Sequence, residues 1–250
     1  FAGPAAAQQA YPSKPIRFIT PFAPGGSTSI LARKVGQKLT ESWGQQVIVD
    51  NRPGGNTLVG SEALVKSAPD GYTIMLASIN HALNPVLIPN WPYDPVKNFA
   101  SVTTLGSSEY MLALNPSVPV GNLQEFIAYA ISRPGQLNFS TPASGGPSHL
   151  AGELFNIRAG VKMVHVPYKG AGPAIIDLIG GQVQLSFVVP LNVLELVKAG
   201  KLKAIAISGK NRMAALPQMP TFTEAGLPNF EPRIWFGVVA PAGSPKPIVG

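Results

Sequence analysis

The chain has 250 residues, 45% of them hydrophobic and only 12% charged, and its 26 glycines and 26 prolines follow no period. This composition excludes a disordered or collagen-like chain, and the absence of cysteine excludes thiol chemistry and disulfides. The net charge of +7 is dispersed along the chain, which argues against nucleic-acid binding and fits either a solvated basic surface or a field that attracts small anions.

The first half predicts alternating strands and helices. Residues 14–24 form an apolar strand that enters a glycine turn, after which Leu31, Val35 and Leu39 recur every four residues as one helical face. A second strand at 47–49, a helix at 58–67 and a third strand at 72–77 follow. This order is typical of a mostly parallel, doubly wound sheet.

The second half predicts another unit of the same kind. Its expected elements are two strands within 102–114, a helix at 122–132, strands at 137–140 and 164–167, helices at 149–157 and 173–180, a strand at 183–188, a helix at 191–199 and a strand at 203–207. No long linker separates the halves, so we expect the chain to cross between two domains through strands.

Two glycine turns of similar composition open helices in the two halves, one at Gly25-Gly26-Ser27 and one at Gly145-Gly146. In doubly wound sheets, ligands bind where such turns lie, beyond the carboxyl ends of the strands. Helix N-termini offer free N–H donors there, and glycine lets a ligand approach the backbone. The paired turns therefore predict one anion held from both sides, although a single such turn is ordinary strand-to-helix chemistry.

Catalytic motifs are scarce. The nucleotide-binding glycine motifs and the Gly-x-Ser-x-Gly elbow are absent from the sequence. Ser148 and His149 are adjacent on an expected helix, so they point in different directions, and a Ser–His pair would need His81 or His165 brought close by folding. The three histidines also argue against a multi-imidazole zinc site. Binding without chemistry is favoured, with a hydrolase using Ser148 or Ser144 as the alternative.

Several motifs together resemble the Bug/TctC family, the extracytoplasmic solute receptors of tripartite tricarboxylate transporters. They occur in register from about residue 12 to 247 and include Pro21-Phe22-Ala23-Pro24-Gly25-Gly26-Ser27-Thr28, Asn51-Arg52-Pro53-Gly54-Gly55-Asn56, Pro69-Asp70-Gly71-Tyr72, His149-Leu150-Ala151-Gly152-Glu153 and Val164-His165-Val166-Pro167-Tyr168-Lys169-Gly170. The resemblance implies an α/β, two-lobed periplasmic binding protein fold (type II-like), in which each lobe is a mostly parallel sheet flanked by helices and the ligand cleft lies between the lobes.

The resemblance also implies the division of the chain and its binding residues. The first lobe is expected at 12–113 plus 228–250, with further helices beyond Pro247 in family members, and the second lobe at 114–227. The expected ligand-binding residues are Phe22, Ala23, Pro24, Gly25, Gly26, Ser27, Thr28, Ser78, Asn80, His81, Ala143, Ser144, Gly145, Gly146, Ser148, His149, Tyr168, Lys169 and Val188.

Two departures from the family pattern bear on the ligand. Ser29 and Val188 stand where family members often carry Asp. Neither can offset a buried ammonium group, so we expect a carboxylate without an amino group, either a dicarboxylate or an aromatic carboxylate.

The resulting expectation is a monomeric periplasmic receptor that passes a small carboxylate to membrane permease subunits, with no cofactor and no metal. A sensory ligand-binding module is a further alternative. No apolar run reaches the ~20 residues of a membrane span. Residues 1–11 lack a basic start, and they fit either the remnant of a removed signal peptide or an unstructured N-terminus.

Overall fold

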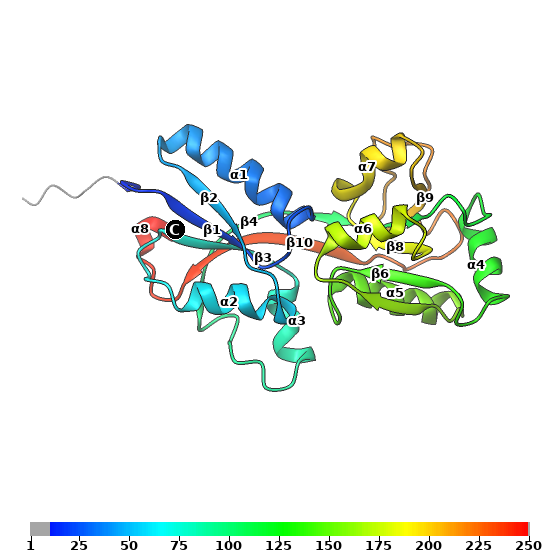
Figure 1. The fold of residues 1–250 in the computed structure, drawn as a ribbon, viewed down its shortest axis with the longest axis horizontal. Helices are drawn as coiled ribbons and strands as arrows, with labels where there is room; N and C mark the ends of the chain where they lie inside the picture. The colour runs from blue at the N-terminus through cyan, green and yellow to red at the C-terminus, as the bar shows by residue number, and fades with distance from the viewer. Residues whose placement is uncertain (1–10, 250) are drawn as a thin grey trace, which may run out of the picture.

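The computed structural model describes residues 11–249, and it contains two five-stranded sheets. Nearly all of the segment expected as a signal-peptide remnant, residues 1–11, lies outside this range. Within residues 11–249 no helix is long and apolar enough to cross a membrane. In Figure 1 the two lobes lie side by side, and β4 and β10 run from one toward the other.

The first sheet has the strand order β2-β1-β3-β10-β4. The chain forms β1, β2 and β3 as parallel neighbours, and β10 runs antiparallel to both β3 and β4. The elements of this lobe are β1 (Ile16–Thr20), α1 (Ser27–Trp43), β2 (Val47–Asn51), a 3₁₀ turn (Gly55–Thr57), α2 (Leu58–Val65), β3 (Thr73–Ser78), α3 (Asn80–Leu87), β4 (Phe99–Glu109), β10 (Arg233–Pro241) and α8 (Lys246–Val249).

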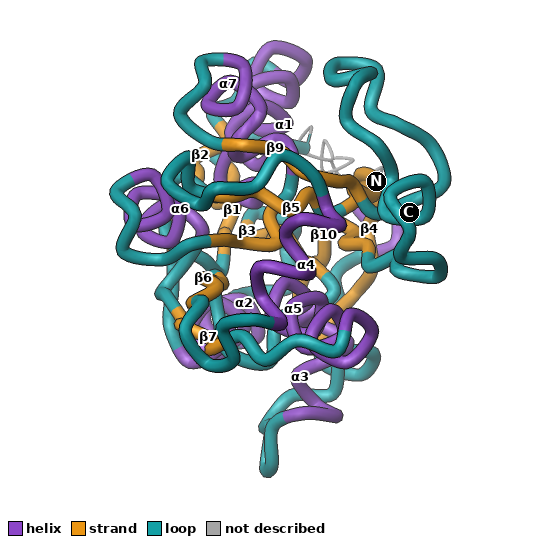
Figure 2. The backbone as a smooth tube through the Cα atoms, turned by 90° about the vertical axis from the view of Figure 1, so that its right-hand side faces the viewer, coloured by secondary structure: helices purple, strands orange, loops and turns teal. Residues whose placement is uncertain are grey.

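The second sheet has the order β7-β6-β8-β5-β9, in which only β5 runs against the other strands. Figure 2 views the molecule from this end and shows helices around the strands. The elements of this lobe are β5 (Met111–Leu114), α4 (Leu123–Ile131), β6 (Asn138–Thr141), α5 (Pro147–Ala159), β7 (Val164–Pro167), α6 (Ala171–Ile179), β8 (Leu185–Val188), α7 (Pro190–Lys198) and β9 (Lys203–Ile207).

The chain changes sheets at Tyr110 and returns between β9 and β10. The sequence expectation gave residues 111–113 to the first lobe, whereas they pair with β8 and β9. It also gave Phe230 to the first lobe, whereas this side chain packs on Phe155 and Phe222. We therefore propose lobe boundaries near residues 110 and 232. The turn-type residues Gly106, Ser107 and Ser108 lie inside β4, before the crossing, and no turn residue stands at Tyr110 itself.

Aromatic side chains fill the core of the second lobe. The Phe155 ring lies 5.4 Å from Phe187 and 5.7 Å from Phe230, and Phe230 lies 4.5 Å from Phe222. All four side chains are essentially inaccessible to solvent. Such ring pairs stabilise the fold by about 0.5–1.5 kcal/mol each beyond the area they bury. This core fixes α5 against β6 and β8, and so fixes where α5 begins.

Gly152 lets α5 lie directly on the sheet, and Gly152→Ala tests this contact. A Cβ at this position would lie 2.2 Å from Cε2 of the buried Phe139 ring. Replacing glycine by alanine inside a helix ordinarily raises the free energy of unfolding by about 0.5–1 kcal/mol. Here we expect a loss of about 1–3 kcal/mol from overpacking, measured by urea unfolding. Gly36→Ala in α1 is the control, because the closest atom to its added Cβ would be Val47 Cγ1 at 3.2 Å, a much longer contact. Equal stability of the two variants would contradict the expectation.

Candidate functional site

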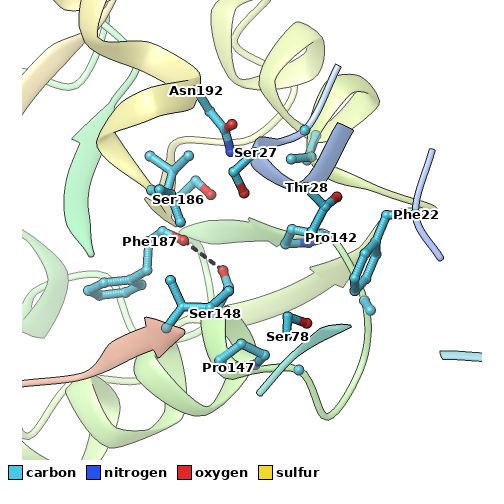
Figure 3. Close-up of a pocket in the computed structure, with 18 of the residues that line it drawn as sticks. Phe22, Ser27, Thr28, Ser78, Pro142, Pro147, Ser148, Ser186, Phe187 and Asn192 are labelled. Carbon is cyan, nitrogen blue, oxygen red and sulfur yellow. Dashed lines mark hydrogen bonds between the residues drawn. The ribbon is translucent and has the colours of Figure 1, made fainter. Parts of the chain in front are cut away.

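A cavity of about 60 Å³ lies between the two lobes (Figure 3). One buried water needs about 10–15 Å³ by this measure, so the cavity has room for a small molecule. The lining residues come from both sheets: Phe22, Gly26, Ser27, Thr28, Ser78, Asn80, Tyr110 and Ile234 around the first lobe and the crossing strands, and Pro142, Ala143, Gly146, Pro147, Ser148, Ala171, Ala174, Ile175, Ser186, Phe187, Val188, Val189 and Asn192 from the second.

Five helices begin at this cavity, namely α1, α3, α5, α6 and α7. Their N-cap residues are Gly26, Ile79, Gly146, Gly170 and Val189, and no side chain caps any of them. Of the helices that begin away from the cavity, α4 is capped by the Asn122 side chain, whereas α2 has no side-chain cap. Uncapped first turns leave backbone N–H donors and the positive end of the helix dipole facing the cavity.

Free N–H groups are found at the start of α1 and α5. The first helical bond of α1 runs from the Ile30 N–H to the Gly26 carbonyl, and that of α5 runs from Leu150 to Gly146. The N–H groups that precede them have no partner among these backbone bonds. Asn80 adds a side-chain donor, because its Nδ2 is buried without a partner while its Oδ1 accepts from the Ser78 hydroxyl. The arrangement can bind an anion from two sides.

The cavity wall carries no formal charge. Among the described lining residues none is Asp, Glu, Lys, Arg or His. Tyr110 is the titratable one, and burial raises its pKa, so its hydroxyl stays neutral. The rest of the wall combines short hydroxyl side chains with apolar ones such as Phe22 and Ile175. An anion here would therefore be held by dipoles and hydrogen bonds rather than by a salt bridge.

The two lobes touch each other around the cavity. The Asn56 side chain of the first lobe donates to the Ser144 carbonyl of the second at 2.8 Å. Gly172 approaches so closely that an added Cβ would lie 2.7 Å from the Pro24 carbonyl oxygen. These contacts describe a closed arrangement in which both lobes surround the cavity.

The structure gathers ten of the expected binding residues around the cavity: Phe22, Gly26, Ser27, Thr28, Ser78, Asn80, Ala143, Gly146, Ser148 and Val188. A neighbouring hollow of about 330 Å³ is lined by Ser144, Tyr168 and Lys169, and it shares Phe22 and Ala143 with the cavity. Tyr168 donates to Asp177, and burial with this bond raises the pKa of Tyr168 to about 12.

The remaining expected residues lie outside the cavity wall. Gly25 faces Gly172 of the opposite lobe, and Ala23 faces Gly170 in the same way, with Pro24 between them. His81 lies near the Pro95 carbonyl and stacks edge-on against Phe99.

Gly145 and His149 bond to each other, since the Gly145 N–H donates to His149 Nδ1 at 2.9 Å. Neither residue is part of the cavity wall, although each is adjacent in sequence to a lining residue.

Three polar lining residues were not expected from the sequence, namely Tyr110, Ser186 and Asn192, and of these Asn192 has an unpaired side-chain oxygen. Asn192 lies in the first turn of α7, its side chain points toward Ser27 in Figure 3, and its Oδ1 is buried without a hydrogen-bond partner. A polar residue in the first turn of a helix that follows a buried strand is the signal that could have identified it.

The serines considered for hydrolase chemistry have no base beside them. Ser148 Oγ donates to the Phe187 carbonyl at 2.7 Å, as the dashed line in Figure 3 shows. The imidazoles of His149 and His165 bond to Gly145 and Thr141 instead. In the described part of the chain, no hydrogen bond joins Ser144 or Ser148 to a histidine.

Comparison with known proteins gives a family match. The family model described as "Tripartite tricarboxylate transporter family receptor" matches residues 31–250. The chain belongs to this family. Protein BugT of Bordetella pertussis is 40% identical over 242 residues, which cover 96% of this chain and 74% of BugT.

Two solved structures of this kind carry carboxylates. A Rhodopseudomonas palustris protein solved with adipate is 34% identical with a TM-score of 0.91, covering 96% of this chain and 80% of its own. MatC from the same species, with bound malate, is 32% identical to this chain with a TM-score of 0.89. The match covers 96% of this chain and 82% of the MatC chain. This family receptor is thus a solute-binding protein with the two-lobed fold, and not an enzyme.

Proposed function

We propose that this receptor captures a small carboxylate between its lobes in the periplasm and, as a monomer, delivers it to the permease subunits of a tripartite tricarboxylate-type transporter. The observation that carries the proposal is the convergence of uncapped helix N-termini on a cavity whose described wall contains no charged side chain. The relatives with bound adipate and malate support the same ligand class.

The carboxylate is held by backbone N–H groups from the first turns of α1 and α5, one helix from each lobe. Hydrogen bonds from such donors to a charged group contribute about 1.5–3 kcal/mol each. The amide of Asn80 and the hydroxyls of Ser27 and Thr28 line the same space and add donors. Because the donors come from both lobes, the bound carboxylate stabilises the closed arrangement.

The body of the ligand packs on the apolar part of the wall. Phe22, Ile175, Phe187 and Val188 line the cavity with the hydroxyl side chains. A dicarboxylate or an aromatic carboxylate presents a carboxylate to the helix N-termini and an apolar skeleton to these side chains. The amino group of an amino acid has no counter-ion among the described lining residues.

A panel of carboxylates tests this function. Thermal unfolding is followed with succinate, malate, adipate, benzoate and terephthalate, and with glucose as the uncharged control. A ligand at a free concentration of about 100 times its Kd stabilises the folded state by about 2.7 kcal/mol. This raises Tm by roughly 5–10 °C for a chain of this size. We expect at least one carboxylate, and not glucose, to produce this shift. No shift with any carboxylate, together with turnover of a chromogenic ester that is lost in Ser148→Ala, would favour the hydrolase.

A further inference from the structure

Two histidines form a stacked pair outside the cavity wall, and His149 follows the lining residue Ser148. The rings of His149, from α5, and His165, from β7, have centroids 3.7 Å apart and planes inclined by 18°. Neither side chain lines the cavity. Both are hydrogen-bonded to the segment 141–146, which we call the second binding loop and which supplies Ala143 and Gly146 to the cavity wall.

His149 holds the middle of this loop. Its Nδ1 accepts the backbone N–H of Gly145 at 2.9 Å. An imidazole nitrogen that accepts a hydrogen bond carries no proton, so the proton of the neutral ring is on Nε2. That atom lies 3.6 Å from Oε1 of Glu153, a geometry that favours this tautomer. Gly145 has a φ of +68°, and because glycine adopts many backbone conformations, this hydrogen bond helps to select one of them.

His165 holds the start of the same loop through Thr141. The His165 Nε2 and Thr141 Oγ1 are 2.6 Å apart, and Thr141 Oγ1 also donates to the Ala143 carbonyl at 3.0 Å. Since the hydroxyl proton is directed to Ala143, His165 donates from Nε2. The two imidazoles thus fix two points of one binding loop.

We propose that His149 is a positioning residue for ligand binding, which holds the second binding loop in its binding conformation only while its imidazole is neutral. Protonation of Nδ1 places an N–H against the Gly145 N–H, so the bond is lost and the loop is released. The proposal rests on the carboxylate site described above, because that loop leads directly into α5, whose first turn supplies the donors of the second lobe. Carboxylate affinity should therefore fall in acid.

The neighbours of the pair determine which ring takes up the first proton. The titratable groups that face His149 are His165 from β7 and Glu153 from its own helix, and the third neighbour is the uncharged Phe139 ring of β6. Histidine side chains ordinarily take up a proton near pH ~6.5. Burial and the adjacent His149 lower the pKa of His165 to about 4. His165 therefore stays neutral between pH 7.5 and 5.5.

Calorimetry with malate and adipate at pH 7.5 and 5.5 tests the proposal. We compare how much the affinity falls from pH 7.5 to pH 5.5 in the parent chain and in His149→Gln. The fall should be about fivefold larger in the parent chain, because that is the factor for loss of one neutral hydrogen bond. The glutamine does not titrate, so its residual pH dependence measures protonation of the ligand itself. His81→Gln is the matched control and should keep the parent pH dependence. An equal fall in parent and His149→Gln would overturn the proposal.

Nuclear magnetic resonance of the ligand-free chain provides a test that needs no ligand. With only three histidines, the ring signals can be assigned from single variants. The Gly145 amide signal should shift with pH together with the His149 ring signals, and it should be constant in His149→Gln. A Gly145 amide that stays fixed while His149 titrates would overturn the proposal. If no carboxylate binds at all, the proposed function fails, but this measurement still decides the role of His149.

Discussion

Gly26→Val and Gly146→Val should each abolish carboxylate binding while both lobes stay folded. Each glycine begins a helix at the cavity and faces the opposite lobe. A Cβ at Gly26 would lie 3.3 Å from the Ala171 Cβ, and a Cβ at Gly146 would lie 3.3 Å from Asn80 Nδ2. The further atoms of valine would enter the contact between the lobes and cover the N–H donors of α1 or α5. Closure around a carboxylate is then blocked.

The fold should tolerate both substitutions. The φ angles are −88° at Gly26 and −75° at Gly146, in the extended region that any residue adopts. Two or three lost charge-assisted bonds correspond to a loss of affinity of at least ~100-fold. Calorimetry with malate and adipate measures this loss, and urea unfolding should show stability within about 1 kcal/mol of the parent chain.

Small-angle scattering tests whether the two valine variants lose binding because their lobes can no longer close around the carboxylate. The parent chain should show a smaller radius of gyration with saturating carboxylate, and the two valine variants should show no change. Gly121→Val is the matched control, because Gly121 is exposed and lies outside the cavity wall. It should bind and compact like the parent chain. Parent-like affinity in both cavity variants would place the carboxylate site elsewhere.

The order of elements was predictable because most strands are short apolar runs bounded by glycine or proline turns. β10 was not predicted: it contains the apolar residues of Arg233–Pro241, but no preceding helix marks it as part of a repeating unit. Its position between β3 and β4 depends on contacts more than 120 residues apart in sequence. The helix α3 was also missed, since Pro85 lies inside it.

The cavity wall was predictable where helices begin and unpredictable where strands cross. Ser27 and Ser148 follow from the rule that ligands bind beyond the carboxyl ends of strands. Tyr110 and Ile234 line the cavity only because the chain changes sheets beside them, which no local pattern indicates. His149 was expected in the wall, but it follows Ser148 on α5, and adjacent helical residues point in different directions. Ser148 therefore faces the cavity while His149 faces His165.

Succinate should bind at least ~30-fold more tightly than aspartate, which differs from it by one amino group. A buried ammonium group without a counter-ion costs several kcal/mol, and about 2 kcal/mol is enough for this ratio. The described cavity wall contains no carboxylate. Two acceptors at the wall are partly occupied, because the Phe187 carbonyl already accepts one bond from Ser148 and the Asn80 Oδ1 accepts one from Ser78. Asn192 Oδ1 is unpaired, but one amide oxygen does not neutralise an ammonium group.

The variant Val188→Asp extends this test to the residue that sets the preference. Of Val188 and Ser29, the two positions where the family resemblance led us to expect Asp, Val188 lines the cavity and Ser29 does not. A carboxylate at 188 would pair with the ammonium group of aspartate and repel the anion of succinate, so the succinate-to-aspartate ratio should fall by at least tenfold. Val188→Asn is the uncharged control of similar size and should leave the ratio near that of the parent chain. Calorimetry of both ligands against the three chains measures the ratios. Tighter binding of aspartate than succinate by the parent chain would show that the ammonium group finds a partner outside this wall.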